Sequence, residues 1–194
     1  MLPNGGAILL AAGQSRRFGS DKRLHTLADG DAVMLRTARQ YAVAFDRLLV
    51  VLRPREADVA KLLKSELGAD ALQVVFAADA ELGMGHSLAA GADAVDGWDH
   101  MFVGLADMPF VRVATLKRLQ AAMRPSGIVL PRFGGQTGHP VGFAAVYLKE
   151  LRSLTGDQGA RRVLEAHPES IVDVAVDDSG VIRDIDRPAD LPSA

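Results

Sequence analysis

Short apolar segments alternate with segments of helical periodicity along most of this chain. Unbroken apolar runs predict strands at residues 7–10, 48–52, 72–76 and 101–105. Helical spacing of apolar positions predicts helices at residues 33–45, 54–67, 84–95 and 112–123, the second of which stops at a glycine, Gly68. Strands that are apolar throughout and separated by helices are typical of a mostly parallel sheet with helices on both faces.

The pattern changes after Pro125. Strands are predicted at residues 128–130 and 141–145, on either side of a polar, glycine-rich loop at 133–139. A pair of helices is predicted between residues 147 and 166, followed by a strand at 171–176 and a turn at 178–180. Because the chain contains no repeat, low-complexity tract or linker, we expect one α/β domain over residues 1–194.

Composition narrows the function classes. Of the 194 residues 48% are hydrophobic, which is enough for a sizeable core, and the net charge of −2 gives no support to a nucleic-acid or membrane-surface role. The chain has no cysteine, which excludes disulfides and thiolate chemistry. The apolar run at residues 7–12 is too short to span a bilayer, and no secretory leader pattern precedes it. We therefore expect a soluble, cytoplasmic protein.

A basic, small-residue turn follows the first predicted strand, from Leu10 to Lys22. Alanine and glycine allow backbone N–H groups to approach a phosphate, and Arg16, Arg17 and Lys22 offer positive charge to offset it. The spacing of Gly13 and Gly19 matches neither a Walker loop nor a dinucleotide fingerprint. From spacing alone, a phosphate site and an ordinary solvated loop are about equally favoured.

Two acidic segments are candidates for metal binding. Asp107 follows the predicted strand at 101–105, where a carboxylate can hold Mg²⁺ against phosphate oxygens. From its position alone, capping of the turn before Pro109 is favoured over metal binding by roughly two to one. Asp186, near the C-terminus, could supply a second carboxylate or could cap a helix before Pro188.

Two glycine-rich segments remain. Residues 82–88 precede a helix whose N-terminus could face an anion or a base, and residues 134–140 have the character of an acceptor-side loop. His86 and His139 lie in these segments. A lone histidine is more often structural than catalytic, and His25, His100 and His167 are expected to be so.

In this order, the segments resemble the MobA-like nucleotidyltransferase superfamily, and within it the molybdenum cofactor cytidylyltransferases. The resemblance extends over nearly the whole chain. Its motifs are the turn from Leu10 to Lys22, Gly83-Met84, Asp107-Met108-Pro109, Gly138-His139-Pro140-Val141, the segment Gly156 to Arg161, and Asp184 to Pro188. At position 12 the chain has alanine, which resembles the CTP-using branch, whereas guanylyltransferases usually carry glycine there. His86 and Ser87 depart from the two polar residues expected after Gly85.

The resemblance implies a Rossmann-like, three-layer nucleotidyltransferase fold that binds NTP in its N-terminal half and the acceptor in its C-terminal half. It implies catalytic roles for Arg16, Lys22 and Asp107, with Mg²⁺ held by Asp107 and Asp186. The residues expected at the NTP are Leu10, Ala11, Ala12, Gly13, Ser15, Arg16, Lys22, Gly83 and Ser87. Those expected at a molybdopterin-type acceptor are His139, Asp157 and Arg161, and a recipient molybdoenzyme or its chaperone is the implied protein partner.

Other functions remain open at this point. Gly85 to Ala89 nearly matches the nucleophile elbow of a serine hydrolase, with Ser87 as the nucleophile, but this interpretation gives Asp107 and Lys22 no purpose. A pterin carrier without catalysis is a second alternative. A nucleotidyltransferase that uses GTP, another NTP or a sugar-phosphate acceptor is a third.

Overall fold

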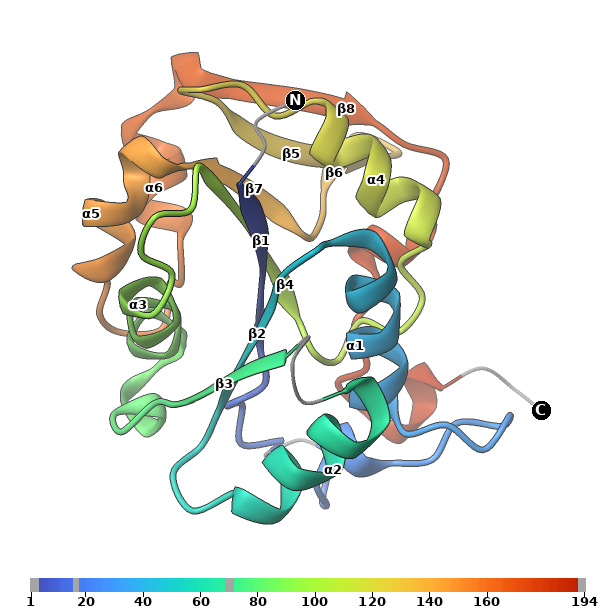
Figure 1. Cartoon of the computed structure of the whole chain (residues 1–194). Helices are drawn as coiled ribbons and strands as arrows, with labels where there is room; N and C mark the ends of the chain where they lie inside the picture. Colours follow the sequence, from blue (N-terminus) through green and yellow to red (C-terminus); the bar gives the residue numbers. More distant parts are fainter. Residues whose placement is uncertain (1–3, 16–17, 69–71, 192–194) are drawn as a thin grey trace.

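The computed structural model describes residues 4–15, 18–68 and 72–191, and these form a mixed, mostly parallel sheet with helices on both faces (Figure 1). The strands are β1 (Gly5–Leu10), β2 (Leu48–Leu52), β3 (Leu72–Phe76), β4 (His100–Leu105), β5 (Ile128–Phe133), β6 (Gln136–Thr137), β7 (Val141–Ala144) and β8 (Ile171–Ala175). The α-helices are α1 (Val33–Ala44), α2 (Ala57–Leu67), α3 (Met84–Asp93), α4 (Val113–Ala121), α5 (Leu148–Arg152) and α6 (Arg161–Ala166).

The strand order is β3-β2-β1-β4-β7-β5-β6, and β8 pairs with β5. All pairings among β1 to β4 are parallel, as is that of β5 with β8, whereas β7 runs antiparallel to both β4 and β5. From β1 the chain winds through β2 to β3 on one side, and β4 then returns to the other side of β1. The strand order therefore reverses between β1 and β4, where open α/β sheets bind their ligands.

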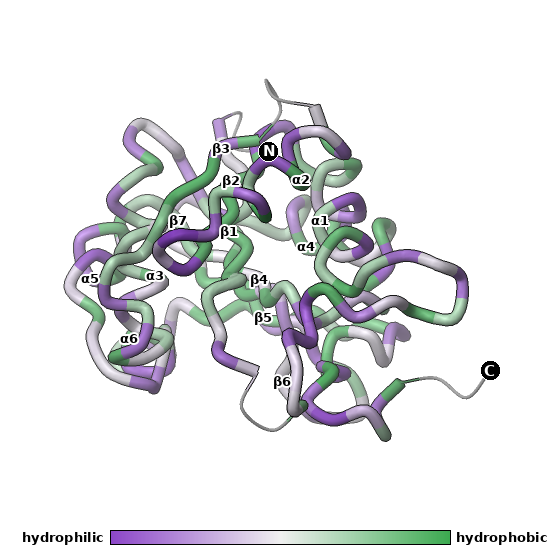
Figure 2. The backbone as a smooth tube through the Cα atoms, turned by 90° about the horizontal axis from the view of Figure 1, so that it is seen from below, coloured by the Kyte–Doolittle hydropathy of each residue, from purple (hydrophilic) through white to green (hydrophobic). Residues whose placement is uncertain are grey.

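The predicted apolar strands form the centre of the sheet. Every residue of β2 is buried, as are residues 7–10 of β1 and 100–104 of β4. Helices α1, α2 and α4 cover one face and α3, α5 and α6 the other (Figure 1). Figure 2 shows the hydrophobic strands inside and the polar segments around them. The predicted fold class is therefore confirmed. The prediction succeeds because strands that are buried on both faces have unbroken apolar runs.

The observed elements differ from the predicted ones mainly at their ends. The helix predicted from Pro54 begins only at Ala57, with Glu56 as its N-cap residue, because Arg55 has a φ of 66° and interrupts helical geometry. It ends as predicted at Gly68, which has a φ of 89°. The turn predicted at residues 178–180 overlaps a short 3-10 helix, η5 (Ser179–Ile182), of which Asp178 is the N-cap residue.

Candidate active site

A cavity of about 370 Å³ lies at the carboxyl ends of β1 and β4. These two strands are paired in register, Leu10 opposite Leu105, so the loops that follow them leave the sheet side by side. The backbone N–H of Ala106 donates to the carbonyl of Leu10 over 3.0 Å, which continues the pairing into the loops. The cavity therefore lies at the point where the strand order reverses.

Of the residues predicted to bind NTP, all that the structure describes line this cavity together with Asp107. They are Leu10, Ala11, Ala12, Gly13, Ser15, Lys22, Gly83 and Ser87. Arg16, for which a catalytic and NTP-binding role is predicted, lies outside the described residues. The small side chains of the Ala-Ala-Gly sequence leave backbone groups of this turn accessible to a ligand. Ser15 adopts a φ of 50° within the turn.

Lys22 lies between two of the predicted functional carboxylates. It belongs to the 3-10 helix η1 (Lys22–Leu24), and its Nζ is 2.7 Å from Asp107 Oδ2 and 2.8 Å from Asp186 Oδ1. Burial alone would lower the pKa of Lys22, but Asp107 and Asp186 raise it above its ordinary value. The ammonium group is therefore charged throughout the neutral range.

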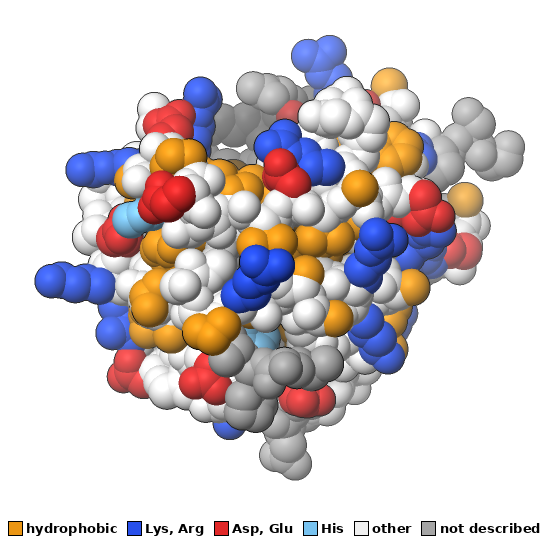
Figure 3. Space-filling view, turned by 90° about the horizontal axis from the view of Figure 1, so that it is seen from above, with side chains coloured by type: hydrophobic (Ala, Val, Ile, Leu, Met, Phe, Trp, Pro, Cys, Tyr) orange, Lys and Arg blue, Asp and Glu red, His pale blue; other side chains and the backbone are white. Residues whose placement is uncertain are grey.

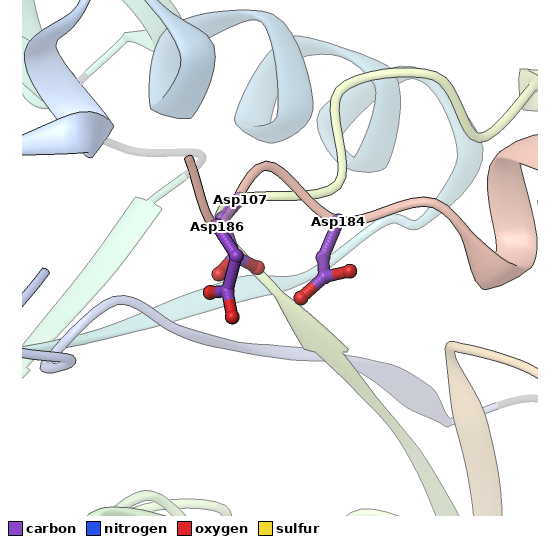
Figure 4. Close-up of side chains that lie close together, drawn as sticks. All are labelled: Asp107, Asp184 and Asp186. Atoms are coloured by element: carbon purple, nitrogen blue, oxygen red, sulfur yellow. The ribbon is translucent and has the colours of Figure 1, made fainter. Parts of the chain in front are cut away.

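A third carboxylate, that of Asp184, completes the cluster. Figure 4 shows Asp107 and Asp186 close together with Asp184 beside them. Ile185 is fully buried and its N–H donates to the carbonyl of Asp107 over 2.9 Å, which fixes the C-terminal segment beside β4. Burial and the negative charges of Asp107 and Asp186 raise the pKa of Asp184.

The chemistry of this cluster fits a divalent cation. One carboxylate oxygen from each aspartate lies within 4.8 Å of the other two. Asp107 Oδ1 is buried and accepts no hydrogen bond from any described residue. A buried carboxylate oxygen without a partner is costly, and Mg²⁺ and similar ions take carboxylate oxygens as ligands. Asp184 is thus a third candidate metal ligand beside Asp107 and Asp186, the two that the sequence predicts.

Gly83 lines the cavity, and Gly85 lies two residues further on, at the start of α3. Gly83 has a φ of 130°, and a side chain on it would come within 2.4 Å of the backbone of Gly156. The N–H of Gly85 donates to the carbonyl of Gly156 over 2.7 Å, which ties the start of α3 to the loop before α6. This contact brings Asp157, predicted on the acceptor side, to the rim of the cavity, where it also borders a second hollow between α5 and α6.

The other two predicted acceptor residues lie outside the cavity lining. The N–H of His139 donates to the carbonyl of Val181 over 2.7 Å, and its Nδ1 is buried without a partner among the residues described here. Burial lowers the pKa of His139 against the opposing influence of Asp107 and Asp184. Arg161 is exposed at the start of α6 and pairs with Glu165 over 2.8 Å.

Asp184 and Arg23 are among the residues of the site for which the sequence predicts no role. Asp184 lies within the motif Asp184 to Pro188, and its spacing of two residues from Asp186 is the signal that indicates it. Arg23 lines the cavity but is buried in a network of ion pairs. No motif in the sequence distinguishes Arg23 from a solvated arginine, because its partner Glu56 lies 33 positions away.

One face of the molecule is mixed in charge. The face that lies uppermost in Figure 1 carries basic and acidic side chains interspersed with hydrophobic ones (Figure 3). No helix in the described part of the chain is long and apolar enough to cross a membrane.

Such a site, with a small-residue turn, a lysine and a carboxylate cluster where the strand order reverses, defines a nucleotide-binding α/β enzyme. Residues 7–171 match the MobA-like NTP transferase domain. The chain is 31% identical over 188 residues to the purine catabolism protein PucB of Bacillus subtilis, covering 93% of this chain and 91% of that protein.

Solved structures agree with this match. Rv0371c from Mycobacterium tuberculosis superposes with a TM-score of 0.83 at 28% identity, covering 98% of this chain and 96% of that one. A second structure of Rv0371c, in complex with manganese, superposes with a TM-score of 0.77 at 26% identity, covering 97% and 96%. The chain therefore belongs to the MobA-like NTP transferase family and is a nucleotidyltransferase.

Family membership decides against a serine hydrolase, and the structure supports that decision. Ser87 is buried in the first turns of α3 and lines the cavity. Within the described residues no hydrogen bond joins its hydroxyl to a histidine, the usual base of an activated serine.

Proposed function

We propose that this protein transfers CMP from CTP to the terminal phosphate of a molybdopterin-type acceptor and releases pyrophosphate. The observation that carries the proposal is the position of Lys22, between Asp107 and Asp186 on one wall of a cavity built from a small-residue turn. The acceptor assignment rests on the segments Gly138 to Val141 and Gly156 to Arg161, which resemble those of the molybdenum cofactor cytidylyltransferases.

The charges of the substrates explain why such a site needs no nucleophilic side chain. The acceptor phosphate is already ionised at neutral pH, and one of its oxygens attacks the α-phosphorus of CTP. A new oxygen–phosphorus bond forms while the bond to the β-phosphate breaks, and pyrophosphate leaves on the opposite side. Since two anions must meet, positioning and charge neutralisation supply most of the catalysis.

The chain's own residues fit this task. Backbone N–H groups of residues 12–15 approach the phosphates, and the ammonium of Lys22 offsets the charge that develops on the leaving group. Asp107 and Asp186, joined by Asp184, would hold Mg²⁺, which when bound supplies further neutralisation of the phosphate oxygens. The manganese complex of Rv0371c supports a divalent cation in a relative of this chain.

The acceptor is expected beside the same carboxylates. The loop at residues 138–140 contacts η5 through the hydrogen bond from His139 to Val181, and this contact holds the segment that carries Asp184 and Asp186. Asp157 reaches the rim of the cavity from the other side. The two segments that resemble the cofactor branch therefore flank the reaction centre.

Base choice is proposed from Ala12. Its methyl group narrows the turn that lines the cavity, where the guanylyltransferases usually carry glycine, and it should disfavour a purine. Hydrophobic pockets discriminate by only about 1–3 kcal/mol per methylene, so a preference of at least about tenfold for CTP over GTP is expected. We also propose that Asp157, Arg161 and His139 serve the acceptor rather than the NTP.

Pyrophosphate release tests the proposal. The protein is incubated with Mg²⁺ and each of the four NTPs, with molybdopterin, with a sugar 1-phosphate and with no acceptor, and Asp107→Asn serves as the inactive control. Release that requires both CTP and molybdopterin supports the proposal. Release with GTP or with the sugar phosphate would assign a different substrate, and tight molybdopterin binding without any release would identify a carrier.

A further inference from the structure

Arg23 connects three segments that meet beneath the cavity. Its guanidinium donates to both carboxylate oxygens of Asp21, to both of Glu56 and to the carbonyl of Ala11. Only 3% of its side chain is exposed. A planar guanidinium can bind two carboxylates and a carbonyl at once, which an ammonium group cannot do with the same geometry.

The partners of Arg23 are themselves fixed. Ala11 continues β1, and its N–H donates to the carbonyl of Val51 over 2.9 Å. Glu56 is the N-cap residue of α2, and Arg53 donates to it from both its backbone N–H and its side chain. Arg53 also binds Asp21 over 2.7 Å, so the two arginines and two carboxylates form a closed network.

This network surrounds Lys22 along the chain. Asp21 caps η1 by accepting a hydrogen bond from the N–H of Arg23, and Lys22 lies between these two residues. The N–H of Lys22 donates to Ser15 Oγ over 3.3 Å. The backbone on either side of Lys22 is thus held by side chains that are anchored to the sheet and to α2.

We propose that Arg23 is a positioning residue for nucleotidyl transfer, which aims Lys22 at the reaction centre by fixing η1 to the end of β1 and to Glu56. The inference rests on the proposed role of Lys22 at the triphosphate. Arg23 touches neither reacting group and acts through Lys22. Displacing a catalytic group by about 1 Å can cost about 100-fold in rate, so a modest loosening of η1 has a large effect.

A double-mutant cycle tests this dependence. Arg23→Lys keeps the charge but removes the fork, and we expect it to lower kcat/KM for pyrophosphate release by about 100-fold in an otherwise unchanged protein. In a Lys22→Ala background the same change should lower kcat/KM by less than about threefold, because the residue through which Arg23 acts is gone. An undiminished loss in that background overturns the proposal.

Arg39→Lys is the matched control. Arg39 also binds two carboxylates, Asp31 and Glu66, but it does not line the cavity. We expect this variant to keep its activity, and an equal loss in Arg39→Lys and Arg23→Lys would show a general effect on folding and overturn the proposal. If Arg23→Lys does not fold, Glu56→Gln is used in the same cycle, because it removes the charge that holds the guanidinium.

A readout without turnover separates this inference from the proposed function. The dissociation constant of CTP with Mg²⁺ is measured by calorimetry for the same four proteins of the cycle. An increase with Arg23→Lys that disappears in the Lys22→Ala background supports positioning even if molybdopterin is not the acceptor. Unchanged CTP affinity together with unchanged turnover in Arg23→Lys contradicts it.

Discussion

Replacing Lys22 by methionine should tighten the binding of a divalent cation in the absence of nucleotide. The ammonium of Lys22 lies 2.7 Å from Asp107 Oδ2 and 2.8 Å from Asp186 Oδ1, so it contacts two of the three carboxylates that fit a cation. An ion that binds there must compete with the ammonium. Methionine has a similar length without the charge, and it leaves the carboxylates free of that competitor.

The magnitude follows from the exposure of the two pairs. The side chains of Lys22 and Asp107 are 10% and 19% exposed, and a hydrogen bond between charged groups in such a place contributes about 1.5–3 kcal/mol. Asp186 is 38% exposed, so its pair is screened and contributes about 0.2–1 kcal/mol. When a cation displaces the ammonium of Lys22, solvation of the ammonium recovers part of the summed energy of the two pairs. We therefore expect a decrease of about tenfold in the dissociation constant, which corresponds to about 1.4 kcal/mol.

Free Mn²⁺, measured by electron paramagnetic resonance at fixed ionic strength, gives the dissociation constant directly. Lys61→Met removes an exposed lysine of α2 and controls for the change in net charge. The same Lys22→Met protein should bind CTP more weakly, because it loses a charge-assisted phosphate contact. Unchanged or weaker Mn²⁺ binding in Lys22→Met would refute the competition and remove the three carboxylates as the cation site.

Three further predictions concern other parts of the molecule. Asp107→Asn should lower turnover by at least about 100-fold while the protein still folds, and near-normal pyrophosphate release would exclude Asp107 from the reaction. Gly83→Ala should lower the free energy of unfolding by about 1–3 kcal/mol and weaken CTP binding, because Gly83 has a φ of 130° and its new methyl group would meet Gly156. Gly97→Ala is the control, since Gly97 has a φ of 75° and open space around it. Equal CTP affinities of the two variants would contradict the reasoning. His100 is buried and has no partner for either ring nitrogen among the residues that the structure describes, and burial lowers its pKa despite the charge of Asp99. Because the unfolded chain takes up a proton below about pH 6.5 and the folded chain resists it, wild type should lose stability relative to His100→Leu as the pH falls from about 7.5 to about 5.5, and parallel curves from chemical denaturation would disprove this.

The hydrophobic pattern predicts the sheet well because its central strands are buried on both faces. The strands at 48–52 and 72–76 match the observed bounds of β2 and β3. Helix ends are less predictable from periodicity, since they depend on distant contacts. The start of α2 is an example: Glu56 accepts hydrogen bonds from Arg23 and Arg53, and periodicity carries no information about these partners.

The residues of the candidate site are likewise predictable from the sequence only in part. Residues close to a turn, such as Ala11, Ala12 and Gly13, can be predicted to share a cavity because one strand delivers them together. The contact of Asp157 with the Gly83 wall depends on how the loop before α6 packs against α3, and sequence order does not reveal it. Lys22 was predicted at a phosphate, whereas its contacts with Asp107 and Asp186 emerge only from the fold.

The most direct test of the proposed reaction is the mass of the product formed from equimolar CTP and GTP with molybdopterin and Mg²⁺. Transfer to the acceptor phosphate predicts a molybdopterin that carries CMP through a diphosphate bond, in excess over any guanine-containing product and absent with Asp107→Asn. A guanine-containing product in excess, or an acceptor of unchanged mass, would contradict the assignment.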